Sequence, residues 1–415
     1  MNWLTLTLSL LIGAPFLLAE DWPAWRGEKQ DARWPTGKLP ADALDQEPKL
    51  LWKMPVGKGF GGVTVMSGRV LLMDRATEPS EIERLLCLDA QSGKVLWEDK
   101  WPVTYGEMGG YSTGPRTSVL QAQIEGKHLA WALGATGNLR CYDVSKGSVV
   151  WAIDCVKKLG AVVPQWGFSG SPVLRDGRLH VHLGIKDGGG SVVAFEPLSG
   201  EVIWTGGFGK AGYCTPEFAD GRLLQWGPDE LEGLDPSTGS KLWSFPYEIT
   251  YGVSIAQPLA VEGIVIVSGY WHGTRALHFP QDDLTPELLW QNEKDICGLM
   301  SSPLYKKGRV YLLDKTHGLT CFDLKTGKIY WQDENKLTPK DRNPHFSLVW
   351  LDESRDLIAV LNANGELVYA KLQADSAEEL ARHQIIGKTW AHPAFFGNRV
   401  IARSDREVVA WETWR

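Results

Sequence analysis

Few residue patterns in this sequence could perform chemistry through their local spacing. His180 and His182 stand two apart on a predicted strand, so they share a face and could bind a metal ion, although a packed or solvated strand face is the more ordinary explanation. The run Asp187–Gly190 resembles a phosphate loop, but no helix follows it, so a hairpin is favoured. The sequence shows no Cys-x-x-Cys pair, and it places no paired acids and no Ser-His-Asp order. We therefore assign no catalytic residue and no metal ligand.

One eleven-residue pattern recurs along the chain and must position any site. It has a small residue, an acid two positions later, a glycine four positions after the acid and a tryptophan four positions after the glycine. Five copies occur, at residues 87–97, 141–151, 194–204, 233–243 and 321–331. Most neighbouring copies begin roughly 40 to 55 residues apart, which is the period of propeller blades.

Each copy predicts a strand, a tight hairpin and a return strand. The acid can accept hydrogen bonds from backbone N–H groups just ahead, and the glycine supplies the positive φ of the turn. Burying an indole removes about 150–250 Å² from water, very roughly 4–6 kcal/mol before entropy is subtracted. We therefore expect tryptophans to dock each blade against its neighbour. The predicted docking residues are Trp52, Trp97, Trp151, Trp204, Trp243, Trp290 and Trp331.

The repeats predict an all-β fold, an eight-bladed β-propeller of four-stranded blades. Leu50–Trp52 looks like the end of a repeat and Ala410–Glu412 like the beginning of one, so the N-terminal strand should pair with the last blade and close the ring. The fifth repeat, about 252–290, is degenerate. The seventh, about 345–386, has no closing tryptophan, its segment Ser376–His383 could form a short helical turn, and seven blades is the alternative count. Four prolines should mark the starts of innermost strands: Pro172, Pro216, Pro258 and Pro303.

Composition and chain ends limit the functional classes. The apolar run Leu4–Leu18 is short for a membrane span and Ala19 offers a cleavage site, so residues 1–19 are a predicted signal peptide, 20–48 an N-terminal arm and 49–415 the propeller. No cysteine follows the apolar run to carry a lipid anchor. A net charge of −7 without a basic stripe argues against nucleic acid. We expect a periplasmic or secreted monomer without a membrane span.

The cysteines and the arm have structural explanations. Three cysteines occupy the same small slot in separate repeats, too far apart for a disulfide, and should be buried thiols: Cys87, Cys141 and Cys321. A single bridge among Cys155, Cys214 and Cys297 stays open. In the arm, the indoles of Trp22 and Trp25 are expected to cover a flank of the ring, with a ligand role for Trp25 and Arg26 as the alternative.

The repeat resembles the tryptophan-docking motif of pyrroloquinoline quinone (PQQ) type propellers, A-x-D-x-x-x-G-K-x-x-W. The residues that match outright are Asp89, Gly93, Lys94 and Trp97, and again Asp323, Gly327, Lys328 and Trp331, while Cys87 and Cys321 replace the alanine. The resemblance covers about Leu50 to the C-terminus and implies an eight-bladed ring locked by tryptophans. Two branches share this scaffold. One is the propeller subunit of the outer-membrane β-barrel assembly machinery, a binding scaffold, and the other is the quinoprotein alcohol dehydrogenases, which hold PQQ and calcium beside adjacent cysteines that this chain lacks.

The mouth of the central channel is the predicted ligand site, because innermost strands and the loops before them converge there. The candidates are Arg116, Trp166, Tyr213, Tyr251, Gln257, Met300, His345, Trp390 and His392. Such a set suits a quinone, a sugar or a peptide segment, and equally a plugged funnel. We predict an exported, non-enzymatic scaffold that binds a protein or a cell-envelope polymer and needs no cofactor. A PQQ-dependent oxidoreductase with calcium and a carbohydrate-binding propeller are the alternatives.

Overall fold

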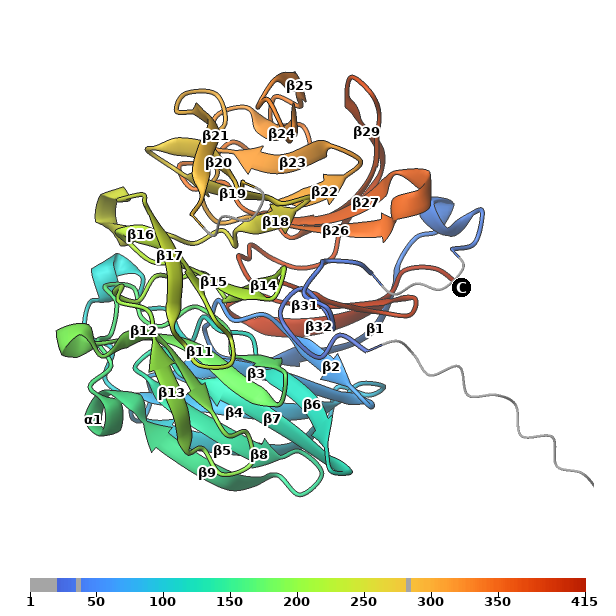
Figure 1. The fold of residues 1–415 in the computed structure, drawn as a ribbon. Coiled ribbons are helices and arrows are strands. Elements are labelled where there is room, and N and C mark those ends of the chain that lie inside the picture. Colours follow the sequence, from blue (N-terminus) through green and yellow to red (C-terminus); the bar gives the residue numbers. More distant parts are fainter. Residues whose placement is uncertain (1–20, 35–38, 281–284) are drawn as a thin grey trace, which may run out of the picture.

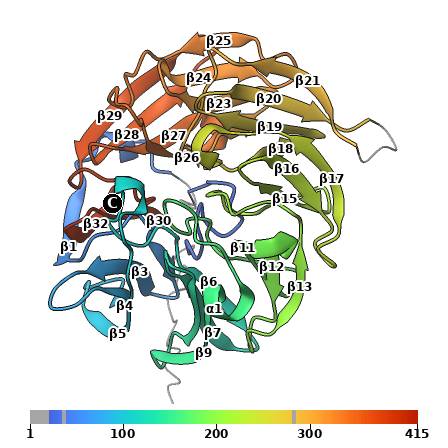
Figure 2. The same cartoon turned by 90° about the vertical axis from the view of Figure 1, so that its left-hand side faces the viewer.

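The chain folds into eight four-stranded antiparallel sheets that stand as blades around one axis (Figures 1 and 2). The structure is a computed structural model that describes residues 21–34, 39–280 and 285–415, so the predicted signal peptide lies outside the described residues. Figure 2 looks onto one face of the ring. The predicted eight-bladed β-propeller is confirmed, and the seven-bladed alternative is wrong.

The first four blades follow the chain, each running from its innermost to its outermost strand. Blade 1 contains β2 (Thr64–Met66), β3 (Arg69–Ala76), β4 (Ile82–Asp89) and β5 (Val95–Pro102). Blade 2 contains β6 (Leu120–Ile124), β7 (Lys127–Leu133), β8 (Asn138–Asp143) and β9 (Ser148–Asp154). Blade 3 contains β10 (Val173–Arg175), β11 (Arg178–Ile185), β12 (Gly190–Phe195) and β13 (Val202–Gly206). Blade 4 contains β14 (Glu217–Ala219), β15 (Arg222–Trp226), β16 (Glu230–Leu234) and β17 (Lys241–Pro246).

The remaining blades keep this order until the last one. Blade 5 contains β18 (Leu259–Val261), β19 (Ile264–Gly269), β20 (Gly273–His278) and β21 (Glu287–Asn292). Blade 6 contains β22 (Leu304–Lys306), β23 (Arg309–Asp314), β24 (Gly318–Asp323) and β25 (Ile329–Gln332). Blade 7 contains β26 (Phe346–Asp352), β27 (Leu357–Asn362), β28 (Glu366–Leu372) and β29 (Ala377–Gln384). Blade 8 contains β30 (Ala394–Phe396), β31 (Arg399–Arg403), β32 (Glu407–Glu412) and β1 (Lys49–Pro55).

Short helical segments occur only in the connections of the described chain. They are α1 (Cys155–Leu159), η1 (Ala43–Asp45), η2 (Met108–Gly110), η3 (Lys186–Gly188), η4 (Thr250–Gly252) and η5 (Glu353–Arg355). None of these described helices is long and apolar enough to cross a membrane.

The ring closes through its N-terminal strand. β1 pairs antiparallel with β32 from Lys49↔Glu412 to Pro55↔Glu407, and it forms the outermost strand of blade 8. The predicted closure is therefore confirmed. The predicted helical turn at 376–383 is wrong, because all but the first of these residues lie in β29, which pairs with β28 through one register shift. The four prolines immediately precede β10, β14, β18 and β22, as predicted for the starts of innermost strands.

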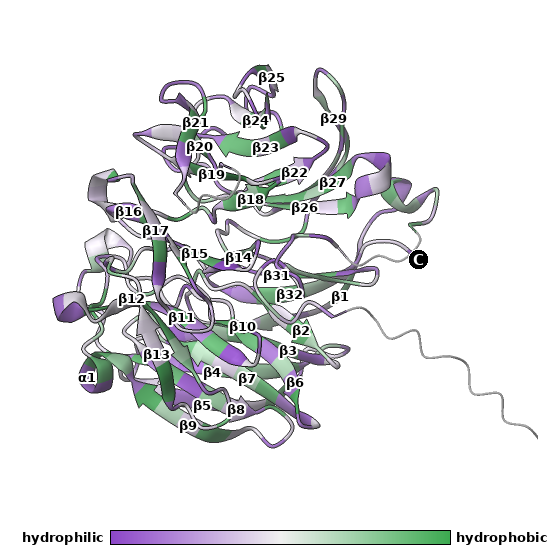
Figure 3. Ribbon diagram, viewed as in Figure 1, coloured by the Kyte–Doolittle hydropathy of each residue, from purple (hydrophilic) through white to green (hydrophobic). Residues whose placement is uncertain are grey.

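The apolar core lies between neighbouring blades. Middle strands such as β12, β19 and β27 are buried at every position, whereas outer strands such as β5 and β21 are largely exposed. Figure 3 shows apolar residues, in green, along β23 and β32, and hydrophilic residues, in purple, at many turns. All six cysteines are buried free thiols. Burial raises the pKa of the Cys87 and Cys141 thiols to about 12, so both stay protonated, as expected of small core side chains.

Turn glycines of the repeat pack directly against the tryptophan of the preceding blade. Gly147 has a φ of +69°, and a Cβ built on it would lie 2.6 Å from the Trp97 ring. Four further pairs repeat this contact: Gly93 with Trp52, Gly200 with Trp151, Gly239 with Trp204 and Gly327 with Trp290. The turn glycine is thus required twice, for its backbone conformation and for the space above its Cα.

Indole N–H groups add a polar link at some junctions. Trp97 Nε1 donates to the carbonyl oxygen of Val144 at 2.8 Å, directly after the acid of the next repeat. Trp52, Trp151 and Trp290 make the equivalent bond to Ala90, Pro197 and Leu324. The Nε1 atoms of Trp204, Trp243 and Trp331 have no partner among the described residues. Where the following repeat is degenerate, the indole of Trp243 packs instead against Phe279, with ring centroids 5.1 Å apart.

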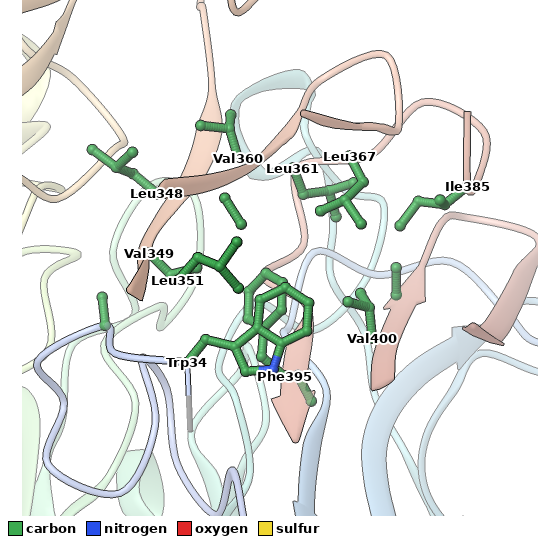
Figure 4. Packing of buried hydrophobic residues seen from close by; sticks show 14 of the residues in the cluster. Trp34, Leu348, Val349, Leu351, Val360, Leu361, Leu367, Ile385, Phe395 and Val400 are labelled. Carbon is green, nitrogen blue, oxygen red and sulfur yellow. The ribbon is translucent and has the colours of Figure 1, made fainter. Parts of the chain in front are cut away.

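The N-terminal arm crosses the centre of the ring, where Figure 2 shows it in blue. Trp22 exchanges two 2.8 Å backbone hydrogen bonds with Val65 of blade 1, and Trp350 of blade 7 donates its backbone N–H to Ala32 and accepts one from Trp34, both at 2.8 Å. Trp34 packs on Phe395 of blade 8, with ring centroids 4.4 Å apart (Figure 4). The expectation that the indoles of the arm cover a flank of the ring is therefore wrong. The innermost strands present free N–H and C=O groups at the centre of the ring, and the arm pairs with them there.

Candidate functional site

A cavity of about 780 Å³ opens at the ring centre, among the loops that lead from one blade to the next inner strand. Eight of the nine candidates line it: Arg116, Trp166, Tyr213, Tyr251, Met300, His345, Trp390 and His392. We call this cavity the cup. The ninth candidate, Gln257, does not line the cup; its side-chain oxygen accepts a hydrogen bond of 3.3 Å from Arg26 Nη1. That these residues bind a ligand stays a prediction.

Serine and threonine residues near the starts of the inner strands form hydrogen bonds between neighbouring blades around the cup. The backbone N–H of Ser118 donates to Ser171 Oγ at 3.0 Å, and the N–H of Ser171 donates to Thr215 Oγ1 at 3.0 Å. A corresponding bond of 3.1 Å joins the N–H of Gln257 to Ser302 Oγ. At these three junctions the following blade satisfies a backbone donor of the blade before it, which fixes the spacing of the lining residues there.

Two groups of aromatic rings line the cup. Phe60 stacks on Trp390 with centroids 5.6 Å apart, and Tyr111 packs on the same indole at 5.9 Å. Elsewhere in the lining, the rings of Trp166 and Tyr213 lie 5.7 Å apart. These aromatic pairs give the cavity an apolar lining, which suits a planar or ring-shaped group.

The rim of the cup is also aromatic. Trp271 meets Tyr251 edge to face at 5.4 Å, and Tyr270 packs on Trp271 at 4.7 Å. Tyr251 holds a φ of +59°, uncommon for a residue other than glycine, and its side chain is 68% exposed. Several aromatic and charged lining residues were not among the sequence candidates. They include Phe60, Tyr111, Trp271 and Arg342.

The arm supplies part of the floor. Trp25 lines the cup and meets the His392 ring edge to face at 5.5 Å. The neighbouring Arg26 is buried and donates from Nη2 to the Pro303 carbonyl at 3.0 Å. Burial lowers the pKa of Arg26 to about 10, so it remains a cation at neutral pH. The minor alternative of the sequence reasoning, an arm that contributes to the site, thus has a geometric basis in Trp25.

Two histidines lie side by side in the lining. The rings of His345 and His392 are 5.5 Å apart; His345 is buried and His392 is partly buried. Burial lowers the pKa of His345 to about 4, although the nearby backbone of Trp390 acts in the opposite direction. Burial, with His345 and Arg26 as neighbouring charges, holds the pKa of His392 well below its usual range. Both imidazoles are therefore neutral at pH 7, and neither ring nitrogen of His345 has a hydrogen-bond partner of ordinary geometry among the described residues.

The charges of the lining are all positive. Arg116 and Arg342 line the cup, and no Asp or Glu of the described chain does so. Arg116 donates to the backbone carbonyls of Tyr111 and Gly114, so it holds its own loop in place. Burial lowers its pKa, but the nearby carboxylate of Glu83 opposes that effect. The cup therefore disfavours cationic ligands.

The other sequence patterns are structural. His180 packs between Trp204 and Phe218, and His182 lies within hydrogen-bonding distance of the Gln225 side chain and accepts from the Gly212 N–H. The described residues contain no group of three or more His, Cys, Asp or Glu side chains arranged to hold a metal. The glycine run after Ile185 is a hairpin, closed by the pair Ile185↔Gly190, as favoured from the sequence.

The donor set does not fit a calcium–PQQ pair. Calcium requires several oxygen ligands, carboxylates above all. The described lining offers neither Asp nor Glu, and its oxygen donors are hydroxyls and the amides of Gln165 and Asn343. The prediction that no cofactor is needed stays a prediction.

Comparison with known proteins agrees with the ring and its repeats. The family model described as "Outer membrane protein assembly factor BamB" matches residues 135–270 and 231–415, more than half of the chain. The chain belongs to this family. The outer membrane protein assembly factor BamB of Yersinia pestis is 23% identical over 270 residues, which cover 62% of this chain. The match spans 66% of that relative, just under two thirds of its length.

Solved structures share the propeller. BamB from Moraxella catarrhalis superposes with a TM-score of 0.58 at 16% identity, over 88% of this chain and 98% of that one. A europium-containing methanol dehydrogenase gives 0.65 at 13% identity, over 93% and 90%. At these identities the likeness concerns the fold alone. It includes both branches that the sequence resembles, a BamB and a dehydrogenase.

Proposed function

We propose that this protein is a non-enzymatic scaffold of the cell envelope that binds protein partners through the face bearing the cup. The observation that carries the proposal is a set of large apolar side chains exposed on that face. They are Val162 (53% exposed), Phe208 (64%), Tyr251 (68%) and Trp271 (43%). Contiguous apolar surface of this kind marks interaction sites on soluble proteins.

A second cavity extends this surface. It has a volume of about 740 Å³, is lined by Val162 and Phe208, and shares Gln165, Tyr213 and Tyr251 with the cup. A partner segment lying over blades 3 to 5 can therefore contact both hollows. Aromatic residues that surround a pocket are the anchors on which most interface energy depends.

Family membership supports an envelope role. The relatives are described as outer membrane protein assembly factors, so we infer that this chain, exported to the periplasm or secreted, serves the assembly of envelope proteins as a monomeric adaptor. Its partners on this proposal are proteins, and a cell-envelope polymer is the less favoured partner.

The test compares two surface variants in affinity capture from cells that produce the protein. The double variant Tyr251→Ser with Trp271→Ser removes the aromatic rim, whereas Leu288→Ser with Leu289→Ser removes two other exposed apolar residues, from the outer strand of blade 5. We expect one protein to be captured by the wild type and by the outer-strand variant, and to be lost from the rim variant. Equal capture by all three proteins would contradict the assignment of this face.

The second candidate is a quinoprotein oxidoreductase, favoured by the methanol dehydrogenase fold and by the aromatic, cationic lining of the cup. Titration of the purified protein with PQQ and calcium, followed by dye-linked alcohol oxidation, separates the two. Quinone binding together with dye reduction would contradict the scaffold proposal. Because the described lining has no carboxylate, we expect neither quinone binding nor dye reduction.

A further inference from the structure

Arg342 is a cation without a partner at the mouth of the cup. It lies in the loop between β25 and β26, it is exposed, and it lines the cavity. No hydrogen bond or ion pair joins its guanidinium group to another described residue. Its backbone is fixed instead, because its carbonyl oxygen accepts from the Tyr270 hydroxyl at 3.0 Å and its N–H donates to the Asp341 carboxylate at 2.5 Å. The loop therefore holds Arg342 beside the aromatic rim, where the described chain uses none of its five side-chain N–H donors.

No Asp or Glu among the described lining residues balances this charge. Arg116, the other charged residue of the lining, is also a cation, but it donates to two backbone carbonyl oxygens of its own loop and has Glu83 nearby. The second cavity differs, since both signs line it and Lys210 there pairs with Asp229 at 3.5 Å. The whole chain carries a net charge of −7. The cup is thus a local positive site in an acidic protein, and a hollow lined by one sign concentrates the opposite sign.

We propose that the cup takes up an acidic side chain, glutamate or aspartate, of a partner protein, with its carboxylate paired to Arg342. Apolar residues next to this acid in the partner sequence then pack on the aromatic rim. This inference rests on the proposed function, since the acid belongs to a protein partner. It adds the chemical identity of the group that the partner presents.

The surroundings of Arg342 favour such a pair. A guanidinium group matches the two oxygens of a carboxylate with parallel N–H donors. Tyr270, whose hydroxyl holds the loop, packs on Trp271 at 4.7 Å, and Trp271 meets Tyr251 at 5.4 Å. A partner segment that covers these rings excludes water from the ion pair, and a lower local dielectric strengthens the attraction. One segment can therefore satisfy the charge and the apolar surface together.

The number of available donors favours a carboxylate over a phosphate. A phosphate group carries a charge of about −1.5 to −2 and three acceptor oxygens. The described lining offers a single unengaged guanidinium group, that of Arg342, because the donors of Arg116 already reach backbone carbonyl oxygens. One guanidinium group matches the single charge of a carboxylate. A lysine or arginine of a partner would meet only like charge in the lining.

The test titrates the purified full chain with two blocked tripeptides, Ac-Phe-Glu-Phe-NH₂ and Ac-Phe-Gln-Phe-NH₂, by ligand-observed NMR. The peptides have nearly the same shape and differ in one charge. We expect the glutamate peptide to bind about three- to tenfold more tightly at low ionic strength, between the effects of an exposed ion pair and of a hydrogen bond to a charged group. The ratio should fall towards one at about 0.5 M salt, where the charges are screened.

Three variants assign the preference to Arg342. In Arg342→Gln the ratio should fall to about one. Arg342→Lys should keep a ratio between one and the wild-type value, because the charge stays and the planar fork is lost. Lys340→Gln removes the same charge from an exposed position two residues earlier, outside the lining, and should keep the wild-type ratio. A thermal melt establishes that all three variants are folded.

Each other outcome counts against the proposal. Equal affinity of the two peptides, no binding at about 10 mM peptide, or a ratio that survives in Arg342→Gln would overturn it. An equal loss in Lys340→Gln would show a diffuse charge effect in place of a site. Tighter binding of the phosphoserine peptide Ac-Phe-pSer-Phe-NH₂ would assign the cup to phosphate groups. If the peptides fail while capture of a partner still depends on Tyr251 and Trp271, the carboxylate assignment falls and the proposed function stands.

Discussion

Replacing Gly200 by alanine tests the docking of one blade on the next. Gly200 has a φ of +72°, and a Cβ there would lie 2.7 Å from Cδ2 and 2.8 Å from Cε3 of Trp151. Gly177, in the same blade, has nearly the same φ, +71°, but a Cβ there meets nothing within 4 Å. The two substitutions therefore share the backbone strain and differ in the collision with the indole.

The magnitudes follow from these two terms. An alanine in the left-handed region costs about 1–2 kcal/mol, which we expect for Gly177→Ala. Overpacking adds about 1–3 kcal/mol, so Gly200→Ala should lower the free energy of unfolding by about 2–5 kcal/mol in total. Moving the Trp151 indole away from this Cβ would break the hydrogen bond of 2.9 Å from its Nε1 to the Pro197 carbonyl oxygen.

Equilibrium unfolding in urea, followed by circular dichroism, measures both variants against the wild type. The midpoint should fall further for Gly200→Ala than for Gly177→Ala, with similar slopes. If the two variants lose equal stability, the contact between the glycine and the indole of the preceding blade does not stabilise the ring, and the reasoning is refuted.

Three further predictions concern a docking tryptophan, the buried histidines and the N-terminal arm. Trp331→Ala should lower the free energy of unfolding by about 3–5 kcal/mol, and an unchanged melt would remove its anchoring role. The free energy of unfolding should fall as pH drops from 6.5 to about 4, since folding holds the pKa of His180, His182 and His345 at about 4, so the unfolded chain binds more protons. His345→Leu should reduce the slope of unfolding free energy against pH by about 1.4 kcal/mol per pH unit, and equal slopes would contradict the burial of His345 as a neutral ring. Burial raises the pKa of Glu217 to about 7, which changes stability with pH in the opposite direction, but it does so equally in both proteins. Arg26→Ala removes the bonds to Gln257 and Pro303, so trypsin should cleave the arm faster than in the wild type, and an unchanged rate would show that these bonds do not hold it.

The fold was predictable because its signal is periodic and local. The repeat defines the outer two strands of a blade, and the matching halves at Leu50–Trp52 and Ala410–Glu412 led to the closure of the ring. The second role of the turn glycine was not predictable, because the indole above Gly147 belongs to another blade. Sequence spacing within one repeat carries no information about that contact.

The candidate site was predictable in outline for the same reason. Residues just before the inner strands converge on the axis, which places Arg116, Trp390 and His392 in the cup. Trp271 was missed, since it enters from the turn between β19 and β20. Trp25, which enters from the arm, was expected at a ligand site only as the alternative. The arm has no counterpart among the repeats, so its path across the ring follows only from the free inner edges that it meets.

Site-specific photo-crosslinking tests the central claim, that the face with the cup binds a protein, most directly. A photoreactive phenylalanine derivative is placed at Tyr251 on the rim, and in a second protein at Leu380, an exposed apolar residue of β29 on the outside of blade 7. The account predicts a discrete protein adduct from position 251 in living cells and none from position 380. An adduct from position 380 alone, or none from position 251 in cells where the partner is captured, would contradict it.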